Sequence, residues 1–216
     1  TLQRWMLIKQ RSFKVTINGV WENQPIQCIT FENPCLTAKN RDEGKDLIPY
    51  KENSGKINFC FVGTFNKEKG IEKIITALEN FNHIKFGNFY FVGDGELKEY
   101  YHARTREFKI NIIFKGFLPK EEINEIYKRC HFIVLPSDNE GFPKVIGEAM
   151  NYGCIPIVSN VSCLGQYIIH RKNGYIIDPL NAATLATIFE ECMVLKNSSF
   201  KEMIATNYSL AAKFTY

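Results

Sequence analysis

No apolar run in this 216-residue sequence approaches the roughly 20 residues that a transmembrane helix needs, so no membrane-spanning helix is predicted. Paired cysteines are missing too: there are seven cysteines, and none forms a CxxC motif, so neither a zinc site nor a redox-active pair is indicated. Cys60, Cys130 and Cys154 lie in or beside apolar runs, where a free thiol behaves as a small hydrophobic group. We therefore expect a reduced, cytoplasmic protein.

A strong charge imbalance is also missing. The chain has 27 basic and 23 acidic residues, a net charge of +4, which is too small a surplus to indicate nucleic-acid binding, although it suits an anionic ligand. The first fifteen residues are more basic, with Arg4, Lys9, Arg11 and Lys14. We predict a solvated basic segment there, and contact with an anionic membrane surface is the alternative.

From Lys56 onward, apolar runs alternate with stretches of helical periodicity. The expected strands are 57–63, 89–93, 111–116, 131–136, 155–159 and 174–178. The expected helices are 70–82, 97–108, 120–130, 143–152, 181–195 and 200–213. Ile123, Ile126 and Tyr127, for example, form one apolar stripe. Continuous apolar strands separated by helices predict a doubly wound α/β domain with a Rossmann-like parallel sheet of about six strands.

The sequence before Lys56 does not follow this alternation. Residues 13–21 and 26–33 predict two short strands around a polar turn. The later part is rich in charged and turn-forming residues, which is typical of a linker. We therefore predict a front segment 1–36, a linker 37–55 and a Rossmann-like domain 56–216. The front segment is too short for a core of its own, so it either docks on the α/β domain or belonged to another domain.

The loops that follow the expected strands are the candidate sites, because open parallel sheets bind ligands beyond the carboxyl ends of their strands. After the first strand, Gly63 permits a tight turn, and Lys69 precedes a helix start, where a lysine can neutralise phosphate. A solvated lysine beside the turn residue Gly70 explains the same pattern. After the second strand, Gly93 and Gly95 give two of the three glycines of a dinucleotide-binding fingerprint, which a plain β–α turn also explains.

The loop after the third expected strand contains Gly116 and Phe117. Backbone groups and an aromatic face at this position could bind a nucleobase. A plain turn, with Pro119 at the following helix start, explains the residues equally well.

The loop after the fourth expected strand leads into a helix and carries Glu140 and Glu148, with seven residues between them. Pro143 suits the first helical turn, and Gly141 allows an anion to approach the free N–H groups there. Glu148 then lies some 7–8 Å along the helix at roughly 1.5 Å per residue. This order of groups matches a ligand with a sugar, a diphosphate and a ribose. The alternative is a surface ion pair between Lys144 and Glu148, worth about 0.2–0.5 kcal/mol.

Taken together, these motifs resemble the C-terminal half of the family-4, GT-B-fold retaining glycosyltransferases (glycosyl transferases group 1), over about 56–196. They occur in the family's order: VGTFNKEKG, VGDGELKEY, FKGFLPKEEINEIYKRCHFIVLPS, EGFPKVIGEAMNYGCIPIVSN and NGYIIDP. The resemblance implies a Rossmann-like domain that forms one half of a GT-B architecture. The reaction would then take place in the cleft between two such domains.

The resemblance also implies roles for individual residues. Glu148 would hold the ribose hydroxyls, Glu140 would contact the transferred sugar and Lys69 the phosphates, and Glu140 and Lys69 would act in the transfer step. The implied donor-binding residues are Gly63, Thr64, Lys69, Phe117, Leu118, Glu140, Gly141, Phe142, Pro143, Lys144, Val145 and Glu148. Thr64 departs from the family, which often has arginine there, so phosphate neutralisation would rest on Lys69, with Lys67 nearby.

The implied activity is transfer of a sugar from a UDP- or GDP-linked donor to a saccharide or lipid-linked acceptor, with retention of configuration. No cofactor or metal is expected. The acceptor would bind an N-terminal domain of which 1–36 is the residual end or the hinge, so the chain by itself is expected to be inactive. We expect a cytoplasmic enzyme, with peripheral contact at the inner face of the membrane as one option.

Three other functions fit parts of the pattern. A nucleotide-sugar epimerase uses a related two-domain fold and similar donor contacts. A non-catalytic nucleotide-sugar-binding module would need no second domain. A dehydrogenase would need glycines that this chain lacks.

Overall fold

A six-stranded parallel sheet forms the centre of the computed structural model, which describes residues 2–9, 13–141 and 143–216. The strands are β3 (Ile57–Val62), β4 (Phe86–Val92), β5 (Asn111–Gly116), β6 (Phe132–Leu135), β7 (Ile155–Ser159) and β8 (Tyr175–Ile177). Their order is β5-β4-β3-β6-β7-β8, and every neighbouring pair is parallel. The predicted doubly wound α/β fold is confirmed.

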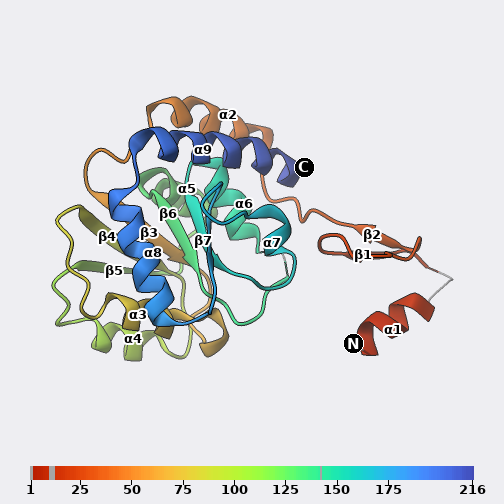
Figure 1. Cartoon of the computed structure of the whole chain (residues 1–216), viewed down its shortest axis with the longest axis horizontal. Helices are drawn as coiled ribbons and strands as arrows, with labels where there is room; N and C mark the ends of the chain where they lie inside the picture. Colours follow the sequence, from red (N-terminus) through yellow and green to blue (C-terminus); the bar gives the residue numbers. More distant parts are fainter. Residues whose placement is uncertain (1, 10–12, 142) are drawn as a thin grey trace.

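Helices cover both faces of this sheet (Figure 1). They are α3 (Ile71–Leu78), α4 (Lys98–Arg104), α5 (Lys120–Arg129), α6 (Lys144–Asn151), α7 (Leu164–Tyr167), α8 (Ala182–Val194) and α9 (Asn197–Ala211). Helix α3 packs against α4 and α8, whereas α6 packs against α5 and α9. Because the sheet is covered on both sides, every residue of β6 and β7 is buried, which explains their uninterrupted apolar sequences.

Aromatic side chains fill much of the core. Phe59 of β3 stacks on Phe86 and Phe89 of β4 and on Phe132 of β6. Such ring pairs contribute about 0.5–1.5 kcal/mol each beyond the burial of their area. All seven cysteines are free and buried, as expected of thiols that act as small apolar groups.

The segment expected to be a linker is instead partly helical. It contains α2 (Ala38–Leu47) and the short 3₁₀ helix η1 (Ile48–Tyr50). Thr37 and Asn40 form a reciprocal capping box at the start of α2. The helix docks through polar contacts, since Arg41 donates to Oδ1 of Asn151 at 2.8 Å and Asn40 donates to the hydroxyl of Tyr152. The predicted linker 37–55 therefore contains a capped helix that packs on the domain surface, which its charged sequence did not indicate.

The two predicted front strands are present. Strands β1 (Val15–Ile17) and β2 (Cys28–Thr30) form a small parallel sheet. The basic segment before them contains α1 (Leu2–Lys9), a helix the sequence pattern did not indicate. In Figure 1, α1 and this strand pair lie to the right of the main sheet. No helix in the described ranges is long and apolar enough to cross a bilayer.

His131, at the start of β6, is held neutral by its surroundings. Its Nδ1 accepts from the backbone N–H of Asn58 at 3.0 Å, and its Nε2 lies 2.9 Å from the carbonyl oxygen of Glu52. Burial, reinforced by the nearby charge of Lys51, lowers the pKa of His131 to about 4. The folded chain therefore resists protonation at this position.

We expect His131 to contribute to acid destabilisation. Between an unfolded pKa of about 6.5 and the folded value of about 4, only the unfolded state binds the proton, so stability is full above pH 6.5 and falls towards pH 4. His131→Asn retains an acceptor for Asn58 and should reduce the loss between pH 7 and pH 4.5 by about 2 kcal/mol. Urea unfolding of both proteins at the two pH values measures this. An equal loss in parent and variant would contradict it.

Candidate active site at the carboxyl edge of the sheet

The strand order places a topological switch point between β3 and β6. From β3 the chain moves outward through β4 and β5, and it then returns to β6 on the other side of β3. The loops after β3 and β6 thus leave the sheet side by side and in opposite directions. Crevices of this kind are where open parallel sheets bind ligands. The loop after β3 carries Lys69, and the loop after β6 carries Glu140.

Lys69 and Glu140 are in direct contact. Nζ of Lys69 lies 2.5 Å from Oε1 of Glu140, and the Glu140 side chain is only 8% exposed. Lys69 ends the short 3₁₀ helix η2 (Lys67–Lys69), which the side chain of Asn66 caps by accepting from the Lys69 N–H at 3.1 Å. The structure therefore brings together the two residues predicted to act in catalysis.

The two loops are tied to each other at further points. The Asp138 N–H donates to the carbonyl oxygen of Glu68 at 2.8 Å, and Lys73 of α3 donates to Oδ1 of Asp138 at 2.8 Å. Gly70 has a φ of 72°, and a Cβ added there would lie 2.0 Å from the carbonyl oxygen of Pro136. Only glycine permits so close an approach with this backbone conformation.

Ser137 holds the carboxylate of Glu140. Its Oγ donates to Oε1 of Glu140 at 2.8 Å, and its own carbonyl accepts from Oγ of Ser159 at 2.6 Å. Ser137 and Ser159 are fully buried. Ser137 and Lys69 share the same oxygen of Glu140, so the other oxygen, Oε2, is available to accept a hydrogen bond among the described contacts. The sequence interpretation missed Ser137, although it directly follows the expected strand 131–136.

Helix α6 begins after this loop, as the sequence predicted. Pro143 occupies its N-cap position, and the Ile146 N–H donates to the Pro143 carbonyl at 3.0 Å. The N–H groups of Lys144 and Val145 therefore belong to the first turn, which has no carbonyl of its own helix to bond. Phe142, also predicted to bind the donor, lies outside the described residues.

Glu148 lies one to two turns into α6 and is mostly buried. Its Oε1 is 3.3 Å from Nζ of Lys120, the first residue of α5, and its side chain is 14% exposed. The described contacts include no ion pair between Glu148 and Lys144, which was the alternative interpretation. Lys120 also donates to the carbonyl of Cys35, which fixes it beside Glu148. No sequence signal singled out Lys120.

Cys35 is buried next to this pair. Burial, with a further effect of the Glu148 charge, raises the pKa of the Cys35 thiol to about 12. The thiol is therefore protonated at neutral pH. Its Sγ lies 3.6 Å from the carbonyl of Lys144, so it packs against the start of α6 rather than acting as a nucleophile.

A cavity of about 280 Å³ lies further along the same edge, beyond β3, β4 and β5. Its lining residues are Val62, Gly63, Thr64, Val92, Gly93, Asp94, Phe117, Leu118 and Ile123. It unites the predicted positions Gly63, Thr64, Phe117 and Leu118, and the Phe117 side chain is 82% exposed. Close packing explains why residue 93 is a glycine: a Cβ there would lie 1.9 Å from the carbonyl oxygen of Gly63.

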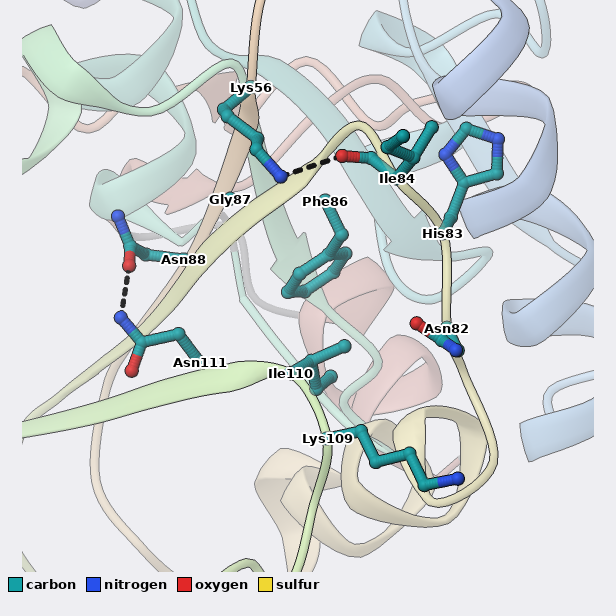
Figure 2. Close-up of a pocket in the computed structure, with 10 residues that line it drawn as sticks. All are labelled: Lys56, Asn82, His83, Ile84, Phe86, Gly87, Asn88, Lys109, Ile110 and Asn111. Atoms are coloured by element: carbon teal, nitrogen blue, oxygen red, sulfur yellow. Dashed lines mark hydrogen bonds between the residues drawn. The ribbon is translucent and has the colours of Figure 1, made fainter.

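A second pocket of about 480 Å³ lies at the opposite, amino-terminal edge of the sheet (Figure 2). Lys56 donates there to the carbonyl of Ile84 at 2.7 Å, and Asn111 donates to the side chain of Asn88 (Figure 2). None of its ten lining residues is acidic, and none was predicted to bind the donor. Size alone therefore does not make it the active site, because it lies before the strands rather than after them.

The model of the family described as "Glycosyl transferases group 1" matches residues 43–208. The chain belongs to this family. Its sheet and flanking helices are those of one Rossmann-like half of the GT-B fold, as predicted.

Individual relatives agree with this assignment. An uncharacterized glycosyltransferase of Methanocaldococcus jannaschii is 30% identical over 149 residues, which cover 68% of this chain and 38% of that protein. The C-terminal domain of a glycosyl transferase group 1 family protein from Francisella tularensis has a TM-score of 0.64 at 20% identity, covering 83% of this chain and 93% of that one. Anabaena HepE in complex with UDP-glucose has a TM-score of 0.65 at 18% identity, covering 83% of this chain and 50% of HepE.

This group 1 chain corresponds to less than half of the two curated glycosyltransferases that it matches. It spans 38% and 43% of the length of two curated glycosyltransferases of Methanocaldococcus jannaschii. The comparison with solved structures establishes the fold, and the family match establishes a glycosyltransferase domain.

Proposed function

We propose that this chain is the donor-binding domain of a glycosyltransferase that takes a sugar from a nucleotide-sugar. The observation that carries the proposal is the contact between Lys69 and Glu140 at the switch point, 2.5 Å apart, with the start of α6 and then Glu148 directly behind it. A cation, free N–H groups and two carboxylates thus follow one another along one edge. HepE, a protein of the same fold, has been crystallised with UDP-glucose.

Each group along this edge suits one part of such a donor. Glu148, a mostly buried carboxylate, would accept hydrogen bonds from the vicinal ribose hydroxyls. The N–H group of Gly141 would meet the sugar, and those of Lys144 and Val145, together with Lys69, would receive the diphosphate. Glu140 would accept from a hydroxyl of the sugar through Oε2, the oxygen that Lys69 and Ser137 do not contact. The cavity at Phe117 and Leu118 would receive the base.

The reaction we propose needs little covalent chemistry from the protein. The bond between the anomeric carbon and the diphosphate oxygen breaks, a bond to an acceptor hydroxyl forms, and the hydroxyl proton passes to the leaving phosphate. Lys69 would offset the negative charge that develops on the diphosphate, and Glu140 would orient the sugar. We propose retention of the anomeric configuration, as the family resemblance implies, and no requirement for a metal.

The acceptor remains a proposal as well. We propose a saccharide or lipid-linked acceptor bound by a second domain, so the chain alone binds donor but transfers no sugar. We also propose a cytoplasmic enzyme that contacts the inner face of a membrane peripherally, for which the basic residues at the start of the chain would be suited.

Isothermal titration calorimetry tests the donor-binding role. The chain should bind either UDP or GDP, and it should bind the matching nucleotide-sugar, such as UDP-glucose or GDP-mannose, more tightly than the nucleotide. Circular dichroism on the same sample establishes that the protein is folded. A folded chain that binds no nucleotide and no nucleotide-sugar would refute the proposal.

A further inference from the structure

Asn18, in the connection that follows β1, reaches the loop that carries Glu140. A Cβ atom added at Gly141 would lie only 2.9 Å from Nδ2 of Asn18. The amide of a front-segment residue therefore borders the residue that directly follows Glu140. No sequence motif singled out Asn18, and nothing in the family resemblance assigned it a role.

The connection around Asn18 is fixed to the α/β domain. Gln166 of α7 accepts from the Val20 N–H at 2.8 Å, and its Nε2 donates to the Val20 carbonyl at 2.9 Å. Oγ1 of Thr30 in β2 donates to the Gly19 carbonyl at 3.1 Å. Gly19 has a φ of 71°, and a Cβ there would lie 2.5 Å from Cβ of Cys163, so the chain passes tightly over the start of α7. Asn18 thus lies between the paired strand β1 and a connection that is fixed at Gly19 and Val20.

The orientation of the Asn18 amide is also fixed. Nδ2 of Asn33 donates to Oδ1 of Asn18 at 2.7 Å, which occupies the oxygen and leaves Nδ2 on the side of Gly141. Within the described part of the chain, Nδ2 of Asn18 donates to no protein acceptor. The side chain is half-buried, so its Nδ2 is accessible from outside the protein. A donor that is held in this position, with no acceptor among the described residues, is available to an atom of a ligand bound beside Gly141.

We infer that Asn18 is a further donor-site residue whose amide donates a hydrogen bond to a hydroxyl oxygen of the transferred sugar. The inference rests on the proposed function of this edge. The position favours the sugar, because Gly141 directly follows Glu140 and precedes the N–H groups of α6 that would receive the diphosphate. The chemistry is complementary: an ionised carboxylate only accepts, the amide Nδ2 only donates, and a sugar hydroxyl does both.

The consequence is that the front segment takes part in recognition of the sugar. Residues 18–33 are anchored to the α/β domain by Gln166. They would contribute the Asn18 amide to a site whose other groups belong to that domain. Which sugar is bound would then depend on the distance between Glu140 and the Asn18 amide as well as on the α/β domain.

Calorimetry on three variants tests the inference, using UDP with UDP-glucose or GDP with GDP-mannose, whichever pair the unchanged chain binds. Asn18→Ala should bind the nucleotide-sugar about tenfold more weakly, because one hydrogen bond is lost, and should bind the free nucleotide unchanged. Asn18→Asp can still accept from Asn33 but cannot donate, so it should show the same selective loss. Thr16→Ala, two residues earlier and exposed, is the matched control and should bind both ligands like the parent.

The outcomes separate this inference from the proposal beneath it. If the parent binds no nucleotide or nucleotide-sugar, the proposed function fails, and the inference fails with it. If the parent binds but Asn18→Ala and Asn18→Asp bind both ligands normally, only the inference is overturned. Equal weakening of the nucleotide and the nucleotide-sugar would place the contact on the nucleotide and would also overturn it. Thermal unfolding of Asn18→Asp verifies that a selective loss is not a loss of fold.

Discussion

Replacing Glu148 by alanine is expected to weaken binding of the nucleotide, and equally of the nucleotide-sugar, by about 10- to 100-fold. The side chain is 14% exposed, and its Oε1 lies 3.3 Å from Nζ of Lys120. A carboxylate in such a position forms charge-assisted hydrogen bonds with ribose hydroxyls, and alanine can form none. Calorimetric titration with UDP and GDP measures the change.

Two further variants make the Glu148 result specific. Glu125→Ala removes an exposed glutamate of α5 that also pairs with a lysine, Lys128, and it should leave nucleotide binding unchanged. Glu140→Ala should weaken only the nucleotide-sugar, because Glu140 is proposed to contact the sugar. An unchanged nucleotide affinity in Glu148→Ala would contradict the assignment of the ribose to Glu148.

Gly70→Ala is expected to destabilise the folded chain by about 3 kcal/mol or more. The backbone there has a φ of 72°, and the new Cβ would lie 2.0 Å from the carbonyl oxygen of Pro136. Relief would require the loops after β3 and β6 to move apart, and these loops carry Lys69 and Glu140. We therefore expect a lower urea midpoint together with weaker nucleotide binding.

Gly55→Ala is the control for the glycine substitution. A Cβ at Gly55 meets no atom within 4 Å, and its φ is not in the left-handed region. This variant should be as stable as the parent or about 0.4–1 kcal/mol more stable, because alanine restricts the unfolded chain. Comparable stability of the two variants would show that the contact with Pro136 is not restrictive.

The sequence was sufficient to predict the sheet, for a physical reason. Strands such as β6 and β7 are buried on both faces, so each appears as an uninterrupted apolar run between amphipathic helices. Helix positions followed from the same alternation, as in 120–130, where the helix found is Lys120–Arg129. Once the strands are parallel, their carboxyl ends share one edge, and this brings Lys69 and Glu140 together.

Helix α2 could not be predicted in the same way. Its sequence, AKNRDEGKDL, has little apolar content, so its periodicity gave no signal. It is stabilised by a cap at Thr37 and by contacts with Asn151 and Tyr152, residues more than one hundred positions later in the chain. Contacts of this kind depend on the tertiary structure. The capping pair Thr37–Asn40 was the only local sign of the helix.

The residues of the candidate site also fall into those that a sequence motif indicates and those that only the tertiary structure reveals. Residues on strand-following loops, such as Glu140, could be predicted because the motif fixes their position in the chain. Ser137, Lys120 and Asn18 could not, because their importance lies in the tertiary structure. Ser137 and Lys120 contact Oε1 of Glu140 and of Glu148, and the Asn18 amide lies beside Gly141. The roles assigned to the predicted donor-binding residues stay predictions until ligand binding is measured.

The burial of all seven thiols has a practical use for those measurements. Maleimide reagents react with exposed thiolates, and none of the native cysteines offers one at the surface. A single cysteine introduced at the exposed position Phe117 would therefore be the fast-reacting thiol of the folded protein. A fluorophore attached there would lie at the mouth of the cavity proposed for the base, where it could report nucleotide binding without any change to Lys69, Glu140 or Glu148.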